Sequence, residues 1–179
     1  MDLVDAVVII RMLNRLDMIN KRLELSDSDV LAYSNNVIDK IKQLDFYNED
    51  MIIGLYMPIK NELDIKLNNK VICYPKVVGN DLEFYIPTKF ELGSFNVLEP
   101  IGSLIDKNDI DIIIVPLLFF DKYNNRVGYG KGYYDRYLKD YKGITIGVGY
   151  DFQEVEEIDA KPTDIKLNYI IKGVKEWKL

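Results

Sequence analysis

Residues 112–115 read IIIV and residues 144–148 read ITIGV, and these two runs decide the fold of the 179-residue chain. Neither run alternates polar with apolar side chains, a pattern typical of strands that are covered on both faces. Between them lie a glycine-rich segment and residues 133–141, which are long enough for a crossover helix. The order strand, helix, strand predicts a central sheet whose strands are mainly parallel.

Two amphipathic helices are predicted ahead of the strands. In residues 4–25 the apolar side chains recur at spacings of three and four, and Ser26 interrupts this pattern. Residues 26–29 read SDSD, which supplies N-cap oxygens and first-turn negative charge for a second helix. Its apolar positions continue to residue 45.

Beyond residue 48 the chain changes to short β-rich segments. Residues 87–108 hold Gly93, Pro100 and Gly102 with little periodicity, so we expect irregular surface chain there. We predict a single α/β domain over residues 1–179, a three-layer sandwich with a mainly parallel central sheet and two N-terminal helices. The expected strands are residues 51–56, 71–74, 82–86, 110–115, 144–149 and 169–171.

The composition limits the possible chemistry. The chain has no histidine and one cysteine, Cys73, which excludes histidine triads, histidine metal cages, disulfide frameworks and cysteine-rich zinc sites. Catalysis must therefore use carboxylates, Lys, Arg, Tyr, backbone amides or an oxygen-bound metal ion. The net charge of −6 argues against a nucleic-acid partner. No apolar run approaches a membrane span, and the single cysteine and the absence of a basic signal-peptide start predict a cytoplasmic protein.

A glycine-rich segment between the two central strands carries the clearest functional pattern. Residues 126–136 read RVGYGKGYYDR, with three alternating glycines ahead of the predicted crossover helix. Backbone amides without a Cβ beside them can approach phosphate oxygens closely, and Lys131 and Arg126 add positive charge. The segment is not a Walker A loop, because no Ser or Thr follows Lys131, and its glycine spacing also fails the dinucleotide fingerprint. The pattern fits either a phosphate-binding loop or a tight strand-to-helix turn with a solvated lysine.

Asp135 follows this loop in the first turn of the predicted helix. Beside bound phosphates it could hold a magnesium ion through one oxygen. The simpler alternative is a negative charge that favours the start of the helix, and only the loop argues for the metal.

These residues resemble the signature of the 5-formyltetrahydrofolate cyclo-ligase family, also called methenyltetrahydrofolate synthetases. The resemblance covers residues 126–136, the apolar strand at 112–115 with Pro116, and the Phe120-Asp121 pair. Further matches are spread in order over almost the whole chain: Arg11, Arg15, Arg22, Pro58, Glu62, Tyr74-Pro75-Lys76, Leu98-Glu99-Pro100, Gln153 and Asp164. Such a dispersed series is more specific than a single glycine-rich loop.

The resemblance implies conversion of 5-formyltetrahydrofolate into 5,10-methenyltetrahydrofolate, dependent on ATP and Mg²⁺, with release of ADP and phosphate. Phosphoryl transfer onto the formyl oxygen would make an imidate phosphate that the second nitrogen of the substrate can attack. This chemistry needs positioning and charge neutralisation more than a protein nucleophile, so the lack of histidine is no obstacle. We expect the cleft at the carboxyl ends of the strands, near the glycine-rich loop.

The resemblance also implies roles for individual residues. Lys131 and Arg126 would be the catalytic cations, and Asp135 and Asp164 would hold the metal. The folate would contact Met57, Glu62, Tyr129, Gly130, Lys131, Gly132 and Tyr133. The nucleotide would contact Arg11, Met12, Leu13, Asn14, Arg15, Arg126, Val127, Gly128, Tyr129, Gly130, Lys131, Gly132, Tyr133 and Tyr134.

Each of these roles has a structural alternative. Arg11 and Arg15 could be solvated charges, Glu62 an exposed loop acid and Asp164 a turn or capping residue. Tyr133 and Tyr134 could be ordinary core packing. At the level of the whole protein, the alternatives are a non-catalytic folate- or nucleotide-binding protein and a phosphosugar-handling enzyme on a similar scaffold. In either case the partner is a small molecule, and we expect a monomer or a weak dimer.

The sequence departs from the family pattern in two places. Thr163 stands where many relatives carry a histidine, so any role of that imidazole cannot apply here. Residues 58–70 form a shorter stretch than is usual in the family, near the minimum for a parallel crossover. We expect a loop or a single helical turn in place of the helix after the first strand.

Overall fold

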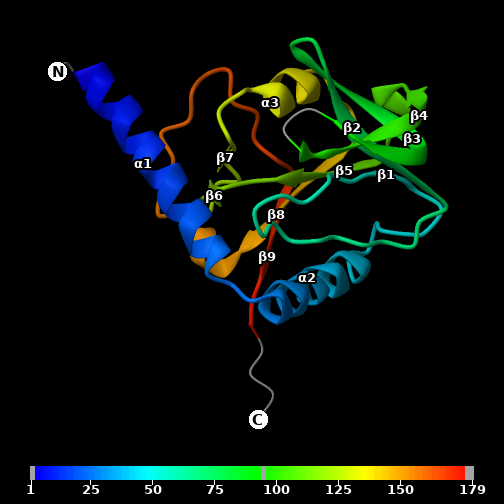
Figure 1. The fold of residues 1–179 in the computed structure, drawn as a ribbon, viewed down its shortest axis with the longest axis horizontal. Helices are drawn as coiled ribbons and strands as arrows, with labels where there is room; N and C mark the ends of the chain where they lie inside the picture. Colours follow the sequence, from blue (N-terminus) through cyan, green and yellow to red (C-terminus); the bar gives the residue numbers. More distant parts are fainter. Residues whose placement is uncertain (1–2, 94–95, 176–179) are drawn as a thin grey trace.

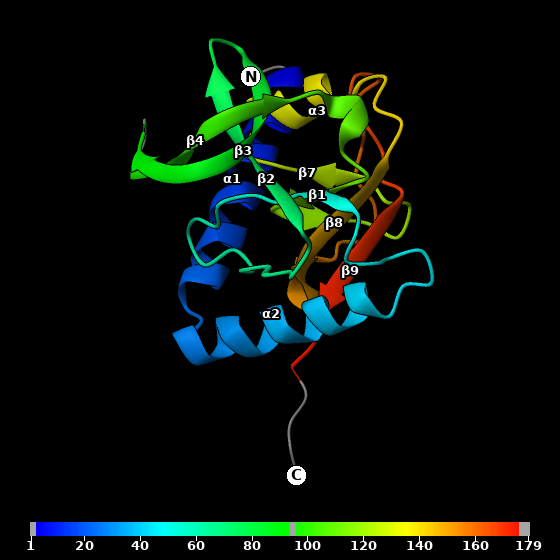
Figure 2. The same cartoon turned by 90° about the vertical axis from the view of Figure 1, so that its right-hand side faces the viewer.

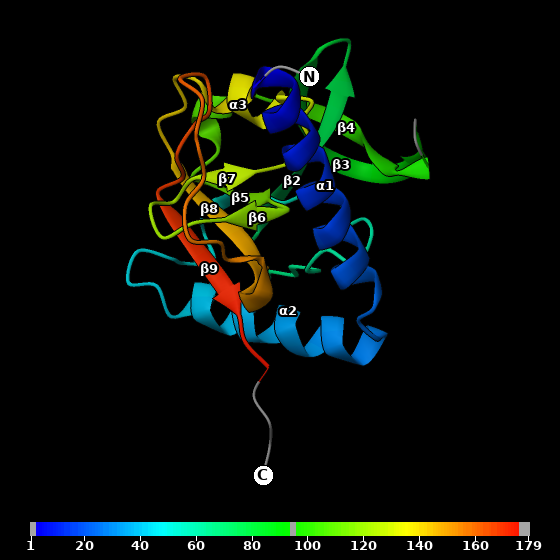
Figure 3. The same cartoon turned by 90° about the vertical axis from the view of Figure 1, so that its left-hand side faces the viewer.

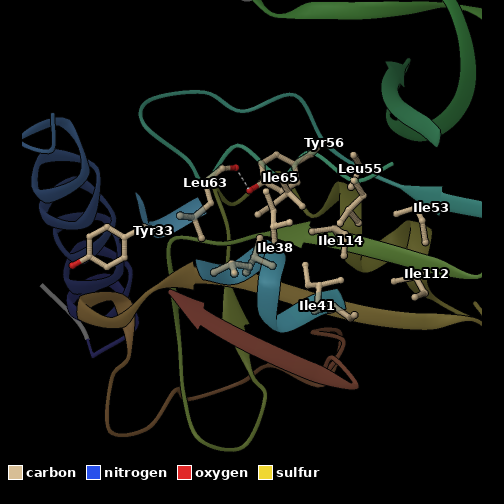
Figure 4. Packing of buried hydrophobic residues seen from close by; sticks show 14 of the residues in the cluster. Tyr33, Ile38, Ile41, Ile53, Leu55, Tyr56, Leu63, Ile65, Ile112 and Ile114 are labelled. Carbon is tan, nitrogen blue, oxygen red and sulfur yellow. Dashed lines mark hydrogen bonds between the residues drawn. The ribbon is translucent and has the colours of Figure 1, made fainter. Parts of the chain in front are cut away.

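The first four residues of β5 (Ile112–Pro116) are all buried, and successive side chains point to opposite faces of the sheet. Ile112 and Ile114 belong to one buried cluster with α2 (Asp27–Lys42), whereas Ile113 and Val115 belong to a second cluster with α3 (Tyr133–Leu138). The sheet is therefore covered on both faces, with α2 on one side and α3 on the other (Figure 1). Figure 4 shows the α2 side of this core, where the Tyr56 hydroxyl donates a hydrogen bond to the Leu63 carbonyl.

The computed structural model describes the backbone of residues 3–93 and 96–175, and the side chains of α1 (Leu3–Leu23) from Met12 onward. Within this part of the chain the main sheet has seven strands in the order β4-β3-β2-β1-β5-β8-β9. The pairings from β2 through β1, β5 and β8 to β9 are parallel, and β3 and β4 are added antiparallel. The remaining strands are β1 (Ile52–Gly54), β2 (Val71–Val78), β3 (Asp81–Leu92), β4 (Leu98–Ile105), β6 (Phe119–Phe120), β7 (Arg126–Val127), β8 (Ile144–Tyr150) and β9 (Tyr169–Gly173), and the 3₁₀ helices are η2 (Lys107–Asp109) and η3 (Asp151–Gln153).

The predicted α/β class, with its mainly parallel sheet and two N-terminal helices, is confirmed. Ser26 is the N-cap of α2, because its hydroxyl oxygen accepts from the Asp29 amide and the Asp29 carboxylate accepts from the Ser26 amide. The segment between β1 and β2 contains a turn at Lys60-Asn61 and no helix, as its length predicted.

The expectation of irregular chain over residues 87–108 is wrong. This segment contains the end of β3 and all of β4, which pair antiparallel from Phe84↔Ile105 to Leu92↔Leu98 (Figure 2). The pairing shifts register between Pro87 and Lys89. Because β4 lies at the edge of the sheet, it tolerates Pro100 and Gly102, and these residues hid the strand periodicity.

α1 runs beside the small sheet formed by β6 and β7 (Figure 3). Met18 is buried against Leu118, Phe119 and Val127, so the helix is held against the segment that leads into the glycine-rich loop. Among the helices in the described part of the chain, none combines the length and apolar character that a membrane crossing requires.

Candidate active site

The glycine-rich loop connects β7 to α3. Gly130 has φ +93° and Gly132 has φ +68°, which are left-handed conformations that favour glycine. Lys131, between them, is exposed, and its ammonium group makes no ion pair or hydrogen bond with the described residues. A charged side chain at the tip of such a loop is available to an anionic ligand. α3 has only six residues, so loop amides and nearby cations, rather than a long helix dipole, would attract that ligand.

The C-terminal half of α1 supplies a second cation to this loop. Arg15 donates from Nε to the Gly128 carbonyl at 3.0 Å, which brings together two segments that the sequence predicted to share a site. Met12, Leu13 and Asn14 are exposed on the neighbouring face of the helix. Arg11, which the resemblance assigns to the nucleotide, lies outside the residues whose side chains the structure describes.

A buried carboxylate lies beside the loop. Glu62 is 5% exposed, and its Oε1 lies 3.6 Å from Nη1 of Arg22 and accepts a hydrogen bond from the Tyr129 hydroxyl at 3.2 Å. Its Oε2 accepts from the Ile59 amide at 3.0 Å. The Tyr129 hydroxyl also accepts from Nη2 of Arg22 at 2.6 Å. Glu62 from the β1–β2 segment, Arg22 from α1 and Tyr129 from the glycine-rich loop therefore form one polar cluster.

Burial dominates the electrostatics of this cluster. Removal of the Glu62 carboxylate from water raises its pKa to about 6, although the positive charge of Arg22 and the donors Ile59 and Tyr129 act in the opposite direction. Burial, followed by the charge of Glu62, raises the pKa of Tyr129 to about 12, so this hydroxyl stays protonated and donates. The carboxylate is thus poised to change its protonation state in mildly acidic solution.

A tight turn holds Glu62 in place. Lys60 and Asn61 both have left-handed backbones, with φ +48° and +55°, and the Glu62 amide donates to the Ile59 carbonyl at 2.9 Å. The Asn61 side chain donates to the Arg22 and Leu25 carbonyls at the end of α1. The turn therefore fixes both the carboxylate and the helix that carries its cationic partner.

The carboxyl ends of β5 and β8 form the base of the cluster. The buried Gln153 side chain donates to the Leu117 and Leu118 carbonyls and accepts from the Tyr150 amide. Arg22 also lies close to the Leu117 carbonyl, with Nη1 at 3.5 Å. The polar cluster thus lies at the carboxyl ends of the strands, where the sequence predicted a cleft.

Arg126 and Asp135 face each other instead of solvent. Nη1 of Arg126 lies 2.9 Å from Oδ1 of Asp135, and Oδ1 also accepts from the Ile165 amide. Asp164 closes a turn through Oδ2, which accepts from the Lys161 amide at 2.8 Å. Arg126 and Asp135 are therefore an ion pair, and Asp164 has the capping geometry that was its structural alternative.

No group of three or more acidic or cysteine side chains suited to holding a metal occurs in the described part of the chain.

The two tyrosines that open α3 differ in their surroundings. The Tyr133 ring lies under the guanidinium of Arg136, 5.3 Å from its Cζ. The Tyr134 hydroxyl is buried without a hydrogen-bond partner among the described residues. Burial raises the pKa of Tyr134, the charge of Glu62 adds to this effect, and that of Arg126 opposes it. The charges of both Glu62 and Arg126 therefore act on the Tyr134 hydroxyl, which has a hydrogen-bond donor that no described residue uses.

Most of the candidate site residues thus lie in the polar cluster of Arg22, Glu62 and Tyr129, in the Arg126–Asp135 ion pair, or in the glycine-rich loop. Met57 is half-buried in the chain after β1, ahead of the turn that holds Glu62. Arg22 belongs to the polar cluster, although the resemblance assigns it no contact with folate or nucleotide. The signal was present, because positions 11, 15 and 22 lie on one face of a helix, but the sequence alone does not distinguish a buried arginine from a solvated one.

A wider hollow than the space beside Glu62 lies away from the predicted site residues. A groove of about 600 Å³ runs between α2 and residues 61–66, and none of the predicted site residues lines it. The space enclosed beside Arg22, Glu62 and Gln153 has no room for a water molecule. The charged and polar contacts of Glu62, Arg22 and Tyr129, and not the size of a cavity, therefore identify the candidate site.

Comparison with known proteins gives a consistent result. The model of the 5-formyltetrahydrofolate cyclo-ligase family matches residues 10–173. A 5-formyltetrahydrofolate cyclo-ligase of Mycoplasma genitalium is 35% identical over 167 residues, which cover 86% of this chain and 92% of that protein. The solved structure of the Aquifex aeolicus 5,10-methenyltetrahydrofolate synthetase has a TM-score of 0.80 at 32% identity and covers 95% of each chain. That of the Mycoplasma pneumoniae 5,10-methenyltetrahydrofolate synthetase has a TM-score of 0.74 at 30% identity, covering 89% of this chain and 96% of that one.

Proposed function

The chain belongs to the 5-formyltetrahydrofolate cyclo-ligase family, a family of enzymes, and from this premise we propose that it converts 5-formyltetrahydrofolate into 5,10-methenyltetrahydrofolate. The reaction consumes ATP in the presence of Mg²⁺ and releases ADP and phosphate. The observation that carries this proposal is the polar cluster, in which Tyr129 of the glycine-rich loop contacts the buried carboxylate of Glu62. A phosphate-binding loop and a group suited to a reduced pterin are thus adjacent.

Glu62 acts on the folate side. An ionised carboxylate accepts hydrogen bonds from ring N–H and amino groups, and it does so more strongly where water is excluded. Arg22 and the Ile59 amide keep the carboxylate in a fixed orientation. We assign Met57, half-buried in the same segment, to this side, where it would offer an adaptable apolar contact to the pterin.

Lys131 and the loop amides act on the nucleotide side. Lys131 is free to follow the phosphoryl group that is transferred, because no protein group in the described chain holds its ammonium. Arg15 stands next to the loop and can add positive charge. Arg126 acts through Asp135, since its guanidinium is directed to that carboxylate.

The covalent path has two steps. The formyl oxygen attacks the terminal phosphorus of ATP, the bond from that phosphorus to the bridging oxygen breaks, and ADP leaves. The second folate nitrogen then attacks the activated formyl carbon and loses its proton, and phosphate leaves with the original formyl oxygen. The protein contributes orientation, charge neutralisation and exclusion of water, and it needs no covalent nucleophile.

The residues present fit a magnesium ion that is bound together with the nucleotide. Mg²⁺ is usually held by one or two carboxylates, phosphate oxygens and water. Asp135 and Asp164 each make their hydrogen bonds through one carboxylate oxygen, which leaves the other to the ion. When bound, the ion supplies charge neutralisation on the phosphates.

The proposal is tested by incubating the protein with ATP, Mg²⁺ and 5-formyltetrahydrofolate and following the near-ultraviolet absorbance of the methenyl product. Absorbance should rise only when all three are present, and ADP should form in equal amount. Folate binding without turnover would instead support a sequestering protein. Turnover of a phosphosugar with indifference to folate would support the other alternative.

A further inference from the structure

Arg136 makes three contacts that connect the glycine-rich loop to another part of the fold. Its Nη1 donates to the Lys131 carbonyl at 3.0 Å and its Nη2 donates to the Asn80 carbonyl at 2.5 Å. Its Nε lies 3.8 Å from Oδ1 of Asp81. Asn80 is in the two-residue turn between β2 and β3, where Val78 pairs with Asp81. One guanidinium therefore joins the tip of the loop to a hairpin turn that is far from it in the sequence.

These contacts direct the guanidinium of Arg136 to oxygens of the protein. Each of its three nitrogens already faces an oxygen of the protein, and its guanidinium lies over the Tyr133 ring. The planar fork of arginine suits such a bridge, because two parallel donors can reach two carbonyls at once. Lysine, with a single ammonium group, cannot reproduce it.

The contact to the Lys131 carbonyl constrains the part of the loop that would meet phosphate. A trans peptide is planar, so the Gly132 amide points away from the Lys131 carbonyl and hence away from Arg136. The same contact limits rotation of the backbone that carries the Lys131 side chain. A Cβ at Gly132 would lie 2.9 Å from Nη1 of Arg136, so a side chain there would push the guanidinium away from the Lys131 carbonyl.

We propose that Arg136 is a positioning residue, which holds Lys131 and the Gly132 amide in the orientation that binds the nucleotide by anchoring the loop to the β2–β3 turn. This inference rests on the proposed function, since it assumes that the nucleotide binds at this loop. Arg136 acts through the loop and does not touch the substrate. Its loss therefore weakens the use of ATP while leaving the Glu62 side of the site intact.

The test compares Arg136→Gln and Arg136→Lys with a matched control, Lys107→Gln. Lys107, in η2, also donates hydrogen bonds to backbone carbonyls near α3. Its Nζ donates to the Tyr137 and Lys139 carbonyls, at the end of α3 that lies away from the loop. The Arg136→Gln variant should raise the KM for ATP by about tenfold to a hundredfold, the range expected for charge-assisted hydrogen bonds. The KM for folate should rise much less, because the folate also binds at Glu62, which Arg136 does not contact. Arg136→Lys, which keeps the charge, should show a smaller increase, and Lys107→Gln should alter neither KM.

A double-mutant cycle with Lys131→Ala separates positioning from direct contact. If Arg136 acts through the loop, the effects of Arg136→Lys and Lys131→Ala on the KM for ATP are less than additive. Additive effects, an unchanged KM for ATP in both Arg136 variants, or an equal increase for both substrates would each overturn the proposal. A wild-type protein that forms product without ATP would refute the proposed function itself, whereas ATP-dependent turnover with unaffected Arg136 variants would refute only the role of Arg136.

Discussion

Replacing Glu62 by glutamine tests the burial of the carboxylate that defines the folate side of the site. The pKa of Glu62 is raised from 4.5 to about 6 by burial, with the charge of Arg22 and nearby donors in opposition. A difference of this size between the unfolded and folded chain corresponds to about 2 kcal/mol. The folded protein favours the protonated form, so this contribution to stability is fully present below about pH 4.5 and is lost as the pH rises through about 6.

The Glu62→Gln variant cannot titrate at this position. The free energy of unfolding of the wild type, minus that of the variant, should therefore fall by about 2 kcal/mol between about pH 4.5 and pH 7. The variant leaves the Arg22 charge without its carboxylate, and this cost falls on the variant alone. Because neither glutamine nor arginine titrates between about pH 4.5 and pH 7, the cost is the same at every pH and does not alter the slope.

The difference in the free energy of unfolding is measured by urea titration at a series of pH values, with circular dichroism as the signal. Glu156→Gln is the control, because Glu156 is exposed and its replacement should leave the pH dependence as in the wild type. Parallel stability curves for the wild type and Glu62→Gln, or a difference that grows as the pH rises, would refute the reasoning from burial.

Four further predictions concern the loop and its supports. Lys131→Ala should change stability by no more than about 0.5 kcal/mol but lower kcat roughly a hundredfold or more, and equal turnover would remove Lys131 from the mechanism. Gly130→Ala should destabilise the loop by about 1–2 kcal/mol because of its positive φ, whereas Gly128→Ala, whose Cβ would meet open space, should not, as urea titrations of both would show. Asp135→Asn should raise the Mg²⁺ concentration needed for half-maximal activity, and an unchanged magnesium titration would count against its role as a ligand. Asp121→Ala should destabilise by about 3 kcal/mol or more by thermal unfolding, since its buried carboxylate accepts three backbone amides and one side chain, and a loss below about 1 kcal/mol would contradict this.

The layer structure could be predicted because local patterns determine it. A continuous apolar run indicates a strand that is covered on both faces, and β5 and β8 are such strands. The Ser26 cap was readable for the same reason, since the hydrogen bonds of a capping box join residues three apart. The strand β4 could not be predicted, because its pairing with β3 is a long-range property and its Pro100 and Gly102 are tolerated only at an edge.

The site could be predicted less completely than the fold. Sequence motifs selected Glu62, Tyr129 and Lys131, but their contacts depend on chain segments that the fold brings together. The burial that raises the pKa of Glu62, and the Arg22 guanidinium beside it, exist only after α1 packs against β6 and β7. The ion pair between Arg126 and Asp135 likewise joins the strand β7 to α3, and no local pattern specifies how these two elements are placed.

The claim that the terminal phosphoryl group of ATP is transferred to the formyl oxygen can be tested by following that oxygen atom. 5-Formyltetrahydrofolate labelled with oxygen-18 in its formyl group is converted in unlabelled water, and the phosphate released is analysed by mass spectrometry. We expect one labelled oxygen atom in each phosphate, because the formyl oxygen is bonded to phosphorus when it leaves the formyl carbon. Phosphate that carries no label, with the oxygen-18 found in water instead, would contradict the account.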